Sequence, residues 1–188
     1  MALSPQEMIQ AIVANLPQKT GKSVEDWVKT LKREGPKDLD KQADWLKKKH
    51  KLGTMTAQII LMHAEGDQHL YDDPDKLIDD LFRGPKKDLK KIYQRILAVT
   101  KKMPGAVAKP CVTYIPFYRR VQFCLVKPSG RASVVLQLAI GKDFPAQGRL
   151  EKIKAPDTRM THRVVLVSPE EIDSDVRDWL KLAHAKSG

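Results

Sequence analysis

The chain has 188 residues and a formal net charge of +11, which is enough length for one large domain or two small ones. No apolar run approaches the ~20 residues of a membrane span, and no basic cluster precedes a hydrophobic stretch near the N-terminus. We therefore expect a soluble, cytoplasmic protein with no membrane association. Cys111 and Cys124 are too few for a disulfide framework, and we expect both thiols to be reduced.

The first 66 residues predict a helical domain of four helices. The first helix begins at Ser4, where Glu7 completes a capping box, and should end by Asn15 because Pro17 follows. Three more helices are expected between Ser23 and Gly35, over about 38–50, and over about 55–65, from apolar residues at helical spacing.

An acidic segment separates this domain from the rest of the chain. Residues 67–84 form either a linker or a short helix that begins at Asp73-Pro74. Residues 67–80 hold six acidic residues against one basic residue. This segment could pair with the basic part of the chain and mask it.

Residues 85–188 predict a basic α+β domain. A long amphipathic helix should run from Lys86 to about Met103, and a last helix should open at the capping box that begins at Ser168. Between them the period changes to two, which predicts an α-β-β-β-β-α module with a mainly antiparallel four-stranded sheet. The expected strands are 111–115, 118–126, 131–140 and 163–168, with Pro128-Ser129-Gly130 as a hairpin turn. Residues 141–160 form a long loop that is either a functional element or simply mobile.

Most of the positive excess lies in the second half. Residues 1–66 hold 11 basic and 8 acidic residues, whereas residues 81–188 hold 22 basic and 9 acidic residues. A field of that size attracts a polyanion or an anionic ligand, although it carries no information about fold.

Strand alternation predicts one polar and one apolar face for the sheet. Guanidinium groups on the polar face could receive phosphates, and nearby aromatic rings could stack on bases. The alternative is an ordinary solvent-facing surface. The expected polar face holds Arg120, Gln122, Ser133, Gln137 and Arg163, and the expected apolar face holds Val121, Phe123, Leu125, Val134, Leu136 and Leu138. The candidate ligand-binding residues are Arg120, Gln122, Arg131, His162, Arg163 and Tyr118.

Several short motifs give weaker signals. Lys47, Lys48, Lys49 and Lys51 are candidate secondary phosphate contacts or a solvated helix end. Gly21-Lys22-Ser23 resembles the end of a P-loop but lacks its first glycine. The helices 38–50 and 55–65 could form a helix-turn-helix, yet the second contains no Lys or Arg.

Nothing in the sequence signals an enzyme strongly. His162 and Arg163 could move a proton and hold an oxyanion, but no nucleophile or carboxylate partner is evident. The five histidines lack metal-ligand spacing. We therefore assign no catalytic residue and expect no metal and no cofactor.

Two groups of motifs resemble known families. The first 70 or so residues resemble the bacterial family called domain of unknown function 4287, and the second half is similar to domain of unknown function 5655, which is often fused to it. The resemblance implies a bacterial origin and a division into two domains, and it brings no established reaction or catalytic residues. The first group is Thr20-Gly21-Lys22, Trp27, Trp45-Leu46, His50, Leu52-Gly53 and Ala57, and the second is Phe123, Val126-Lys127-Pro128, Arg131, Thr161-His162-Arg163-Val164 and Asp178-Trp179-Leu180.

The leading functional hypothesis is a non-enzymatic binding protein that engages nucleic acid or another polyanion through its basic second domain. The alternative is a small-anion-binding or catalytic domain that uses the polar sheet face. A protein-interaction adaptor is the third possibility.

Overall fold

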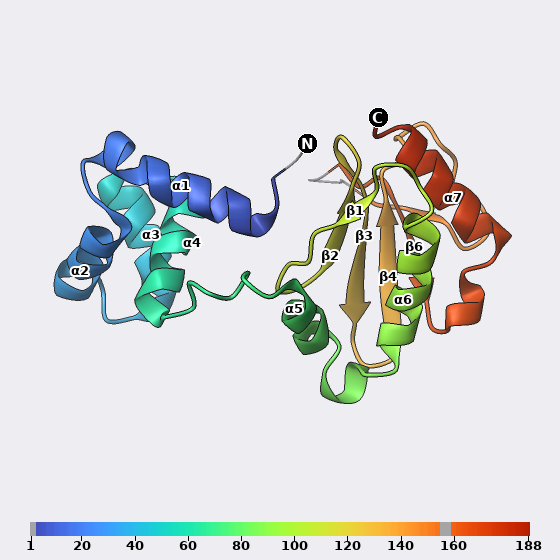
Figure 1. The fold of residues 1–188 in the computed structure, drawn as a ribbon, viewed down its shortest axis with the longest axis horizontal. Helices are drawn as coiled ribbons and strands as arrows, with labels where there is room; N and C mark the ends of the chain where they lie inside the picture. Colours follow the sequence, from blue (N-terminus) through green and yellow to red (C-terminus); the bar gives the residue numbers. More distant parts are fainter. Residues whose placement is uncertain (1–2, 155–158) are drawn as a thin grey trace. The chain divides into compact units, whose positions relative to one another are not determined.

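The computed structural model describes residues 3–154 and 159–188 (Figure 1). Within these ranges the chain forms seven α-helices, two 3-10 helices and one six-stranded sheet. It divides into two compact units, the helical unit Leu3–Asp73 and the α+β unit Pro74–Gly188. Each unit has its own hydrophobic core. No helix in the described ranges is both long and apolar enough to cross a bilayer.

The helical unit contains the four predicted helices, which are α1 (Pro5–Thr20), α2 (Val24–Glu34), α3 (Leu39–His50) and α4 (Thr54–Glu65). The prediction that the first helix ends before Pro17 is wrong, because α1 continues to Thr20. A proline in the last turn removes only one hydrogen-bond donor, so the helix can absorb it. The helix ends at Gly21, whose φ of 73° is left-handed and whose N–H bonds the Pro17 carbonyl oxygen at 2.8 Å.

The α+β unit is built on an antiparallel sheet with the strand order β1-β2-β3-β4-β6-β5. The prediction of four strands is wrong, because two-residue strands at both edges give no readable alternation in sequence. The first predicted strand, 111–115, is also displaced, since β2 begins at Ile115. Residues 155–158 of the long loop lie outside the described residues. The strands are β1 (Val107–Ala108), β2 (Ile115–Tyr118), β3 (Gln122–Ser129), β4 (Ser133–Leu138), β5 (Glu151–Lys152) and β6 (His162–Leu166).

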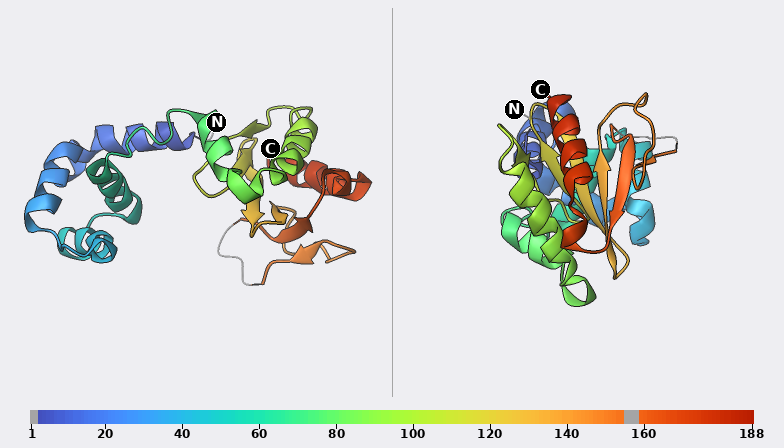
Figure 2. Two further views of the ribbon diagram at one scale, coloured as in Figure 1. Left: turned by 90° about the horizontal axis from the view of Figure 1, so that it is seen from below. Right: turned by 90° about the vertical axis from the view of Figure 1, so that its right-hand side faces the viewer.

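Two helices, α6 (Leu89–Thr100) and α7 (Ser174–Ala185), lie side by side on one face of this sheet (Figure 2). Their apolar stripes pack into the same core as the strands. The shorter helix α5 (Pro74–Leu81) and the 3-10 turn η1 (Gly84–Lys86) precede α6. The acidic segment is therefore divided, with 67–73 in the helical unit and α5 in the α+β unit.

The last helix begins later than predicted. The capping box of Ser168 and Glu171 forms, but it opens only the 3-10 turn η2 (Pro169–Glu171). Asp173 then caps α7 separately by accepting a hydrogen bond from the Val176 N–H at 3.1 Å. The helix predicted from Lys86 to about Met103 is also shorter in the structure. Residues 84–86 form the 3-10 turn η1, and α6 begins only at Leu89.

A β-bulge displaces the alternation of β3 by one residue. Phe117 of β2 pairs with Cys124, whereas the next residue, Tyr118, pairs with Gln122. Phe123 is the extra residue, and both it and Cys124 are fully buried. Leu125 therefore lies on the face opposite to the one predicted for it.

The register across β3 and β4 confirms this displacement. Cys124 pairs with Leu138 and Val126 with Leu136, so these four side chains share the buried face. Leu125 pairs with Gln137 on the other face. A single inserted residue thus decides which side chains of β3 reach the core.

We expect each unit to depend on its own core. Leu46 in the helical unit and Leu136 in the α+β unit are both fully buried. Leu46→Ala and Leu136→Ala should each destabilise their own unit by about 2–5 kcal/mol, because each leaves a cavity. Amide hydrogen exchange should show the loss of protection in the substituted unit, and equal loss in both units for either variant would contradict independent cores.

Candidate functional site

The face of the sheet opposite α6 and α7 carries three of the predicted ligand-binding residues, Tyr118, Gln122 and Arg163. Tyr118 lies opposite Gln122 across β2 and β3, and Gln137 lies opposite Arg163 across β4 and β6. The Arg163 guanidinium is held by Glu151 of β5, with Nε and one terminal nitrogen each 2.9 Å from Oε2. This pairing places a carboxylate directly beside Arg163, the cation that β6 contributes to the predicted polar face.

Arg120 and Arg131 do not converge with Arg163. Arg120 lies just before β3 and Arg131 lies in the turn after it, and both side chains are exposed. An eight-residue strand spans about 26 Å at 3.3 Å per residue, so these two cations flank opposite ends of the sheet. They cannot hold one phosphate together.

His162 belongs to the core. It is fully buried on the face that α6 and α7 cover, opposite Leu138. Its Nε2 lies 3.0 Å from the Phe144 carbonyl oxygen, and its Nδ1 lies 3.0 Å from the Thr161 hydroxyl oxygen. Both ring nitrogens are therefore occupied, and His162 shares no surface with its neighbour Arg163.

The lysines at the end of α3 are largely engaged within the helical unit. Lys47 and Lys48 reach the two oxygens of Asp44 at 2.8 and 3.3 Å. Lys49 lies over the Trp45 ring, 5.0 Å from its centroid. Lys51, exposed and left-handed at φ 55°, is the C-cap residue of α3.

An aromatic and cationic cluster surrounds His50. Its ring meets Trp27 and Trp45 edge-on, with centroids 5.0 and 4.6 Å away, and Lys22 lies over Trp27. Burial and the charges of Lys49 and Lys22 lower the pKa of His50. Among described residues, its Nε2 is the one buried side-chain nitrogen or oxygen without a hydrogen-bond partner. Trp27 belongs to the core of the helical unit and Trp45 packs against it, so His50 lies at the edge of that core. Lys49 is held over the Trp45 ring by a cation–π contact.

The positive charge of the chain belongs to the α+β unit. Residues 3–73 hold 11 basic and 11 acidic side chains, whereas residues 74–188 hold 23 basic and 12 acidic side chains. Two acidic side chains of α5 pair locally, Asp79 with Lys90 and Asp80 with Lys76 and Arg83. Neither of them forms an ion pair with the described cations of α7.

A groove between α6 and α7 collects four of these cations. Arg95 and Lys102 come from α6 and the turn after it, and Arg177 and Lys181 come from α7. Spacings of seven and four residues place each pair on one side of its helix. The groove has a volume of about 500 Å³, and its remaining lining residues are Ala98, Val99, Met103, Pro104 and His184.

Three of the four cations lack a carboxylate partner in the described part of the chain. Lys181 pairs with Asp178 at 2.8 Å, but both side chains are about two-thirds exposed, so the pair is weak. No described residue forms an ion pair with Arg95, Lys102 or Arg177. The groove is therefore a concave surface of one charge sign, which focuses positive potential.

Glu170 is the carboxylate whose charge reaches Arg95. A hydrogen bond from Ser168, its own backbone N–H and the charge of Arg95 lower the pKa of Glu170. His184 also lines the groove, and its Nε2 lies 3.0 Å from the Pro104 carbonyl oxygen. Because a carbonyl only accepts, this nitrogen carries a proton.

The groove is lined by cations, apolar side chains and one histidine. None of its described lining residues is a carboxylate, a hydroxyl or a thiol. Burial raises the pKa of Cys111 and Cys124 elsewhere in the unit, which disfavours a reactive thiolate. The described residues hold no cluster of three or more metal-ligating His, Cys, Asp or Glu side chains.

The sequence analysis predicted the amphipathic helix that carries Arg95 but assigned Arg95 to no site. The available signal was the spacing of Arg95 and Lys102, matched by Arg177, Lys181 and His184 on the last helix. The missing information was that the two helices lie side by side, which depends on the sheet beneath them.

Comparison with protein families agrees with this architecture. The family model described as Domain of unknown function (DUF5655) matches residues 78–187, which is more than half of the chain. The chain belongs to the DUF5655 family. A second model, Domain of unknown function (DUF4287), matches residues 8–66, so both resemblances read from the sequence are confirmed. The groove lies within the DUF5655 match. Neither the curated proteins nor the solved structures contain a match to the chain.

His162 should make the stability of the α+β unit depend on pH. Burial lowers the pKa of His162, and the charges of Lys152 and Lys186 lower it further. The hydrogen bond to the Phe144 carbonyl oxygen acts in the opposite direction and raises it. Unfolding restores the ordinary value near 6.5, so the unfolded state binds more protons and stability should fall as pH drops below about 6.5. Hydrogen exchange of the β3 and β4 amides at pH 7 and pH 5 measures this loss.

His162→Gln should flatten that dependence, whereas His50→Gln, in the other unit, should leave it in place. An unchanged pH dependence in His162→Gln would show that another group is responsible.

Proposed function

We propose that the DUF5655 domain binds nucleic acid or a similar polyanion in the groove between α6 and α7. The observation that supports this most directly is the convergence of Arg95, Lys102, Arg177 and Lys181 on one concave surface. Clustered cations that lack protein carboxylates gain most from an external anion. Guanidinium groups bind phosphate in a bidentate manner, and lysines add a flexible point charge.

The geometry favours a chain of phosphates over a single anion. The four cations come from both walls of the groove, Arg95 and Lys102 from α6 and the turn after it and Arg177 and Lys181 from α7, so a phosphodiester backbone lying along it would be contacted from both sides. Binding of this kind is dominated by release of counterions and carries little sequence preference. The proposal therefore assigns the domain a general affinity for polyanions.

A small anionic ligand with an apolar portion is the second candidate. Ala98, Val99, Met103 and Pro104 give the groove an apolar lining beside its cations, and 500 Å³ is a typical volume for a small-molecule site. The sheet face supports a small-anion site less well, because Arg163 already has Glu151 as a partner. Competition separates the two candidates: a mononucleotide that displaces a long oligonucleotide at equal phosphate concentration favours the small ligand.

Removing two groove cations should weaken binding and reduce its salt dependence. We expect Arg95→Ala/Arg177→Ala to lower the affinity for mixed-sequence DNA or RNA in fluorescence anisotropy at a series of salt concentrations. The slope of log K against log salt should fall by about 0.9 for each lost contact to B-DNA phosphate.

The matched control is Lys127→Ala/Arg131→Ala, which removes the same charge from exposed positions outside the groove. Equal loss in both double variants would show that the charge acts diffusely, and no binding by the wild type at low salt would refute the proposal.

A further inference from the structure

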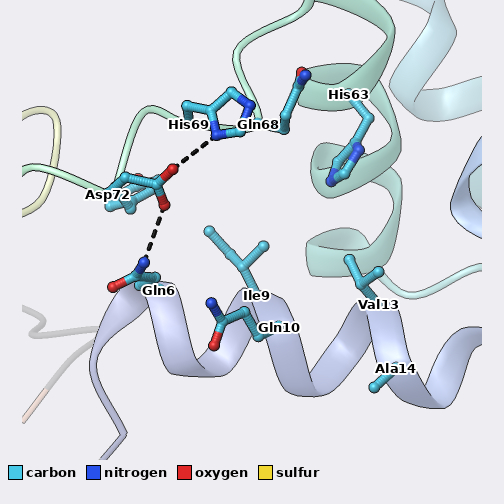
Figure 3. Close-up of a pocket in the computed structure, with 10 residues that line it drawn as sticks. Gln6, Ile9, Gln10, Val13, Ala14, His63, Gln68, His69 and Asp72 are labelled. Carbon is cyan, nitrogen blue, oxygen red and sulfur yellow. Dashed lines mark hydrogen bonds and ion pairs between the residues drawn. The ribbon is translucent and has the colours of Figure 1, made fainter.

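A second cavity lies entirely within the helical unit (Figure 3). It is formed by the first half of α1, the end of α4 and the segment that follows α4. Its volume is about 410 Å³, within the usual range for small-molecule sites. It is lined by Gln6, Ile9, Gln10, Val13, Ala14, His63, Gln68, His69, Tyr71 and Asp72.

The floor of the cavity is apolar. Ile9 and Val13 are four residues apart on α1, and Figure 3 shows both side chains directed toward the side of the cavity where His63 of α4 lies. Val13 also packs against the core of the helical unit, whereas Ile9 is not part of that core. The floor therefore offers a partly buried apolar surface at the edge of that core.

The polar rim is held in place by hydrogen bonds. Asp72 accepts one from the Gln6 side-chain amide at 3.0 Å and one from His69 Nδ1 at 2.7 Å. The chain reaches this position because α4 ends at Gly66, whose φ is 86°, and the N–H of Asp67 bonds back to the Met62 carbonyl oxygen at 2.9 Å. Gln6, His69 and Asp72 are thus held to one another before any ligand binds.

The lining excludes anionic ligands. It contains no Lys or Arg, in contrast to the groove of the α+β unit, and Asp72 would repel a phosphate or a carboxylate. Both Asp72 oxygens already accept hydrogen bonds, so the carboxylate is satisfied without an external cation. An uncharged ligand meets these constraints best.

Side-chain amides are suited to reading the edge of a heterocycle. Gln10 and Gln68 are exposed, so their side chains can turn toward a ligand and offer it two N–H donors and one carbonyl acceptor each, which can pair with neighbouring donors and acceptors on a planar ring. The rings of His63 and His69 add flat surfaces beside the apolar floor. We propose that this cavity binds an uncharged nitrogen heterocycle of nucleobase size, with Gln10 and Gln68 on its polar edge and Ile9 beneath its ring. This proposal does not depend on polyanion binding by the other unit.

The test uses the full chain and the free nucleosides adenosine, guanosine, cytidine and uridine. These probes carry no phosphate, so they do not report on the basic groove. Saturation-transfer NMR should detect binding, and calorimetry should give a Kd of about 10 µM to 1 mM for at least one nucleoside, as expected for a small uncharged ligand.

Two pairs of variants locate the site. Ile9→Trp fills the cavity and Gln68→Ala removes an edge contact, and each should weaken binding at least ~10-fold, about the loss of one good contact. Ile9→Leu keeps the apolar floor, and Gln18→Ala removes an exposed amide of α1 outside the cavity. Both controls should leave the Kd within about twofold. Circular dichroism and the thermal midpoint check that each variant is folded.

A measurement on the unmodified chain guards against unfolding of the variants. The side-chain amide signals of Gln10 and Gln68 should shift on titration with the bound nucleoside, while that of Gln18 should not. Absence of binding by every nucleoside at millimolar concentration would overturn the proposal. Tighter binding of an aliphatic amine such as putrescine than of any nucleoside would also overturn it, because the site would then select a cation through Asp72.

Discussion

The arrangement of the α+β unit depends on one requirement, which is that a single face of the sheet must be buried under two helices. Ile92 and Ile96 of α6 and Val176 and Leu180 of α7 are all at most 1% exposed in the common core. Burial of that apolar surface is the main favourable term in folding. To cover the sheet, the two helices must lie side by side, and their polar flanks then face one another across a groove.

The groove therefore follows from the packing of the two helices on the core, and four of the residues that line it are cations. Each helix buries one stripe, so the residues at its border point toward the neighbouring helix. Arg95 and Arg177 occupy such border positions. Acidic residues there would have cancelled the cations, as Asp79 does for Lys90 nearer the start of α6. The resulting surface is consistent with binding of an anion and contributes little to stability.

Much of this fold could be predicted from the sequence. Capping residues such as Ser4, Ser23 and Ser168 indicated where helices or turns begin, because a side-chain oxygen that accepts a backbone hydrogen bond is a local feature. The four central strands could also be recognised, although the first was misplaced. The two edge strands could not, because two residues have no periodicity and their pairing depends on distant partners.

The candidate site could be predicted only in outline. The bulge at Phe123 moves Leu125 to the other face of the sheet, and no local pattern marks such an inserted residue. His162 and Arg163 are adjacent in sequence, yet one is in the core and the other pairs with Glu151 on the far face. The cations that do converge come from helices about 80 residues apart, so their proximity follows from tertiary packing alone.

The edges of the sheet limit how this domain can recognise another chain. An unpaired strand normally presents a row of backbone N–H and C=O groups, to which a partner can add a strand of its own. Here β1 and β5, which occupy the outermost positions, are each only two residues long. So short a strand gives an incoming segment only a few backbone partners on β1 or β5 themselves. On the β5 side the longer uncovered edge is Val164–Leu166 of β6, which continues past its pairing with β5 and is covered by no described strand.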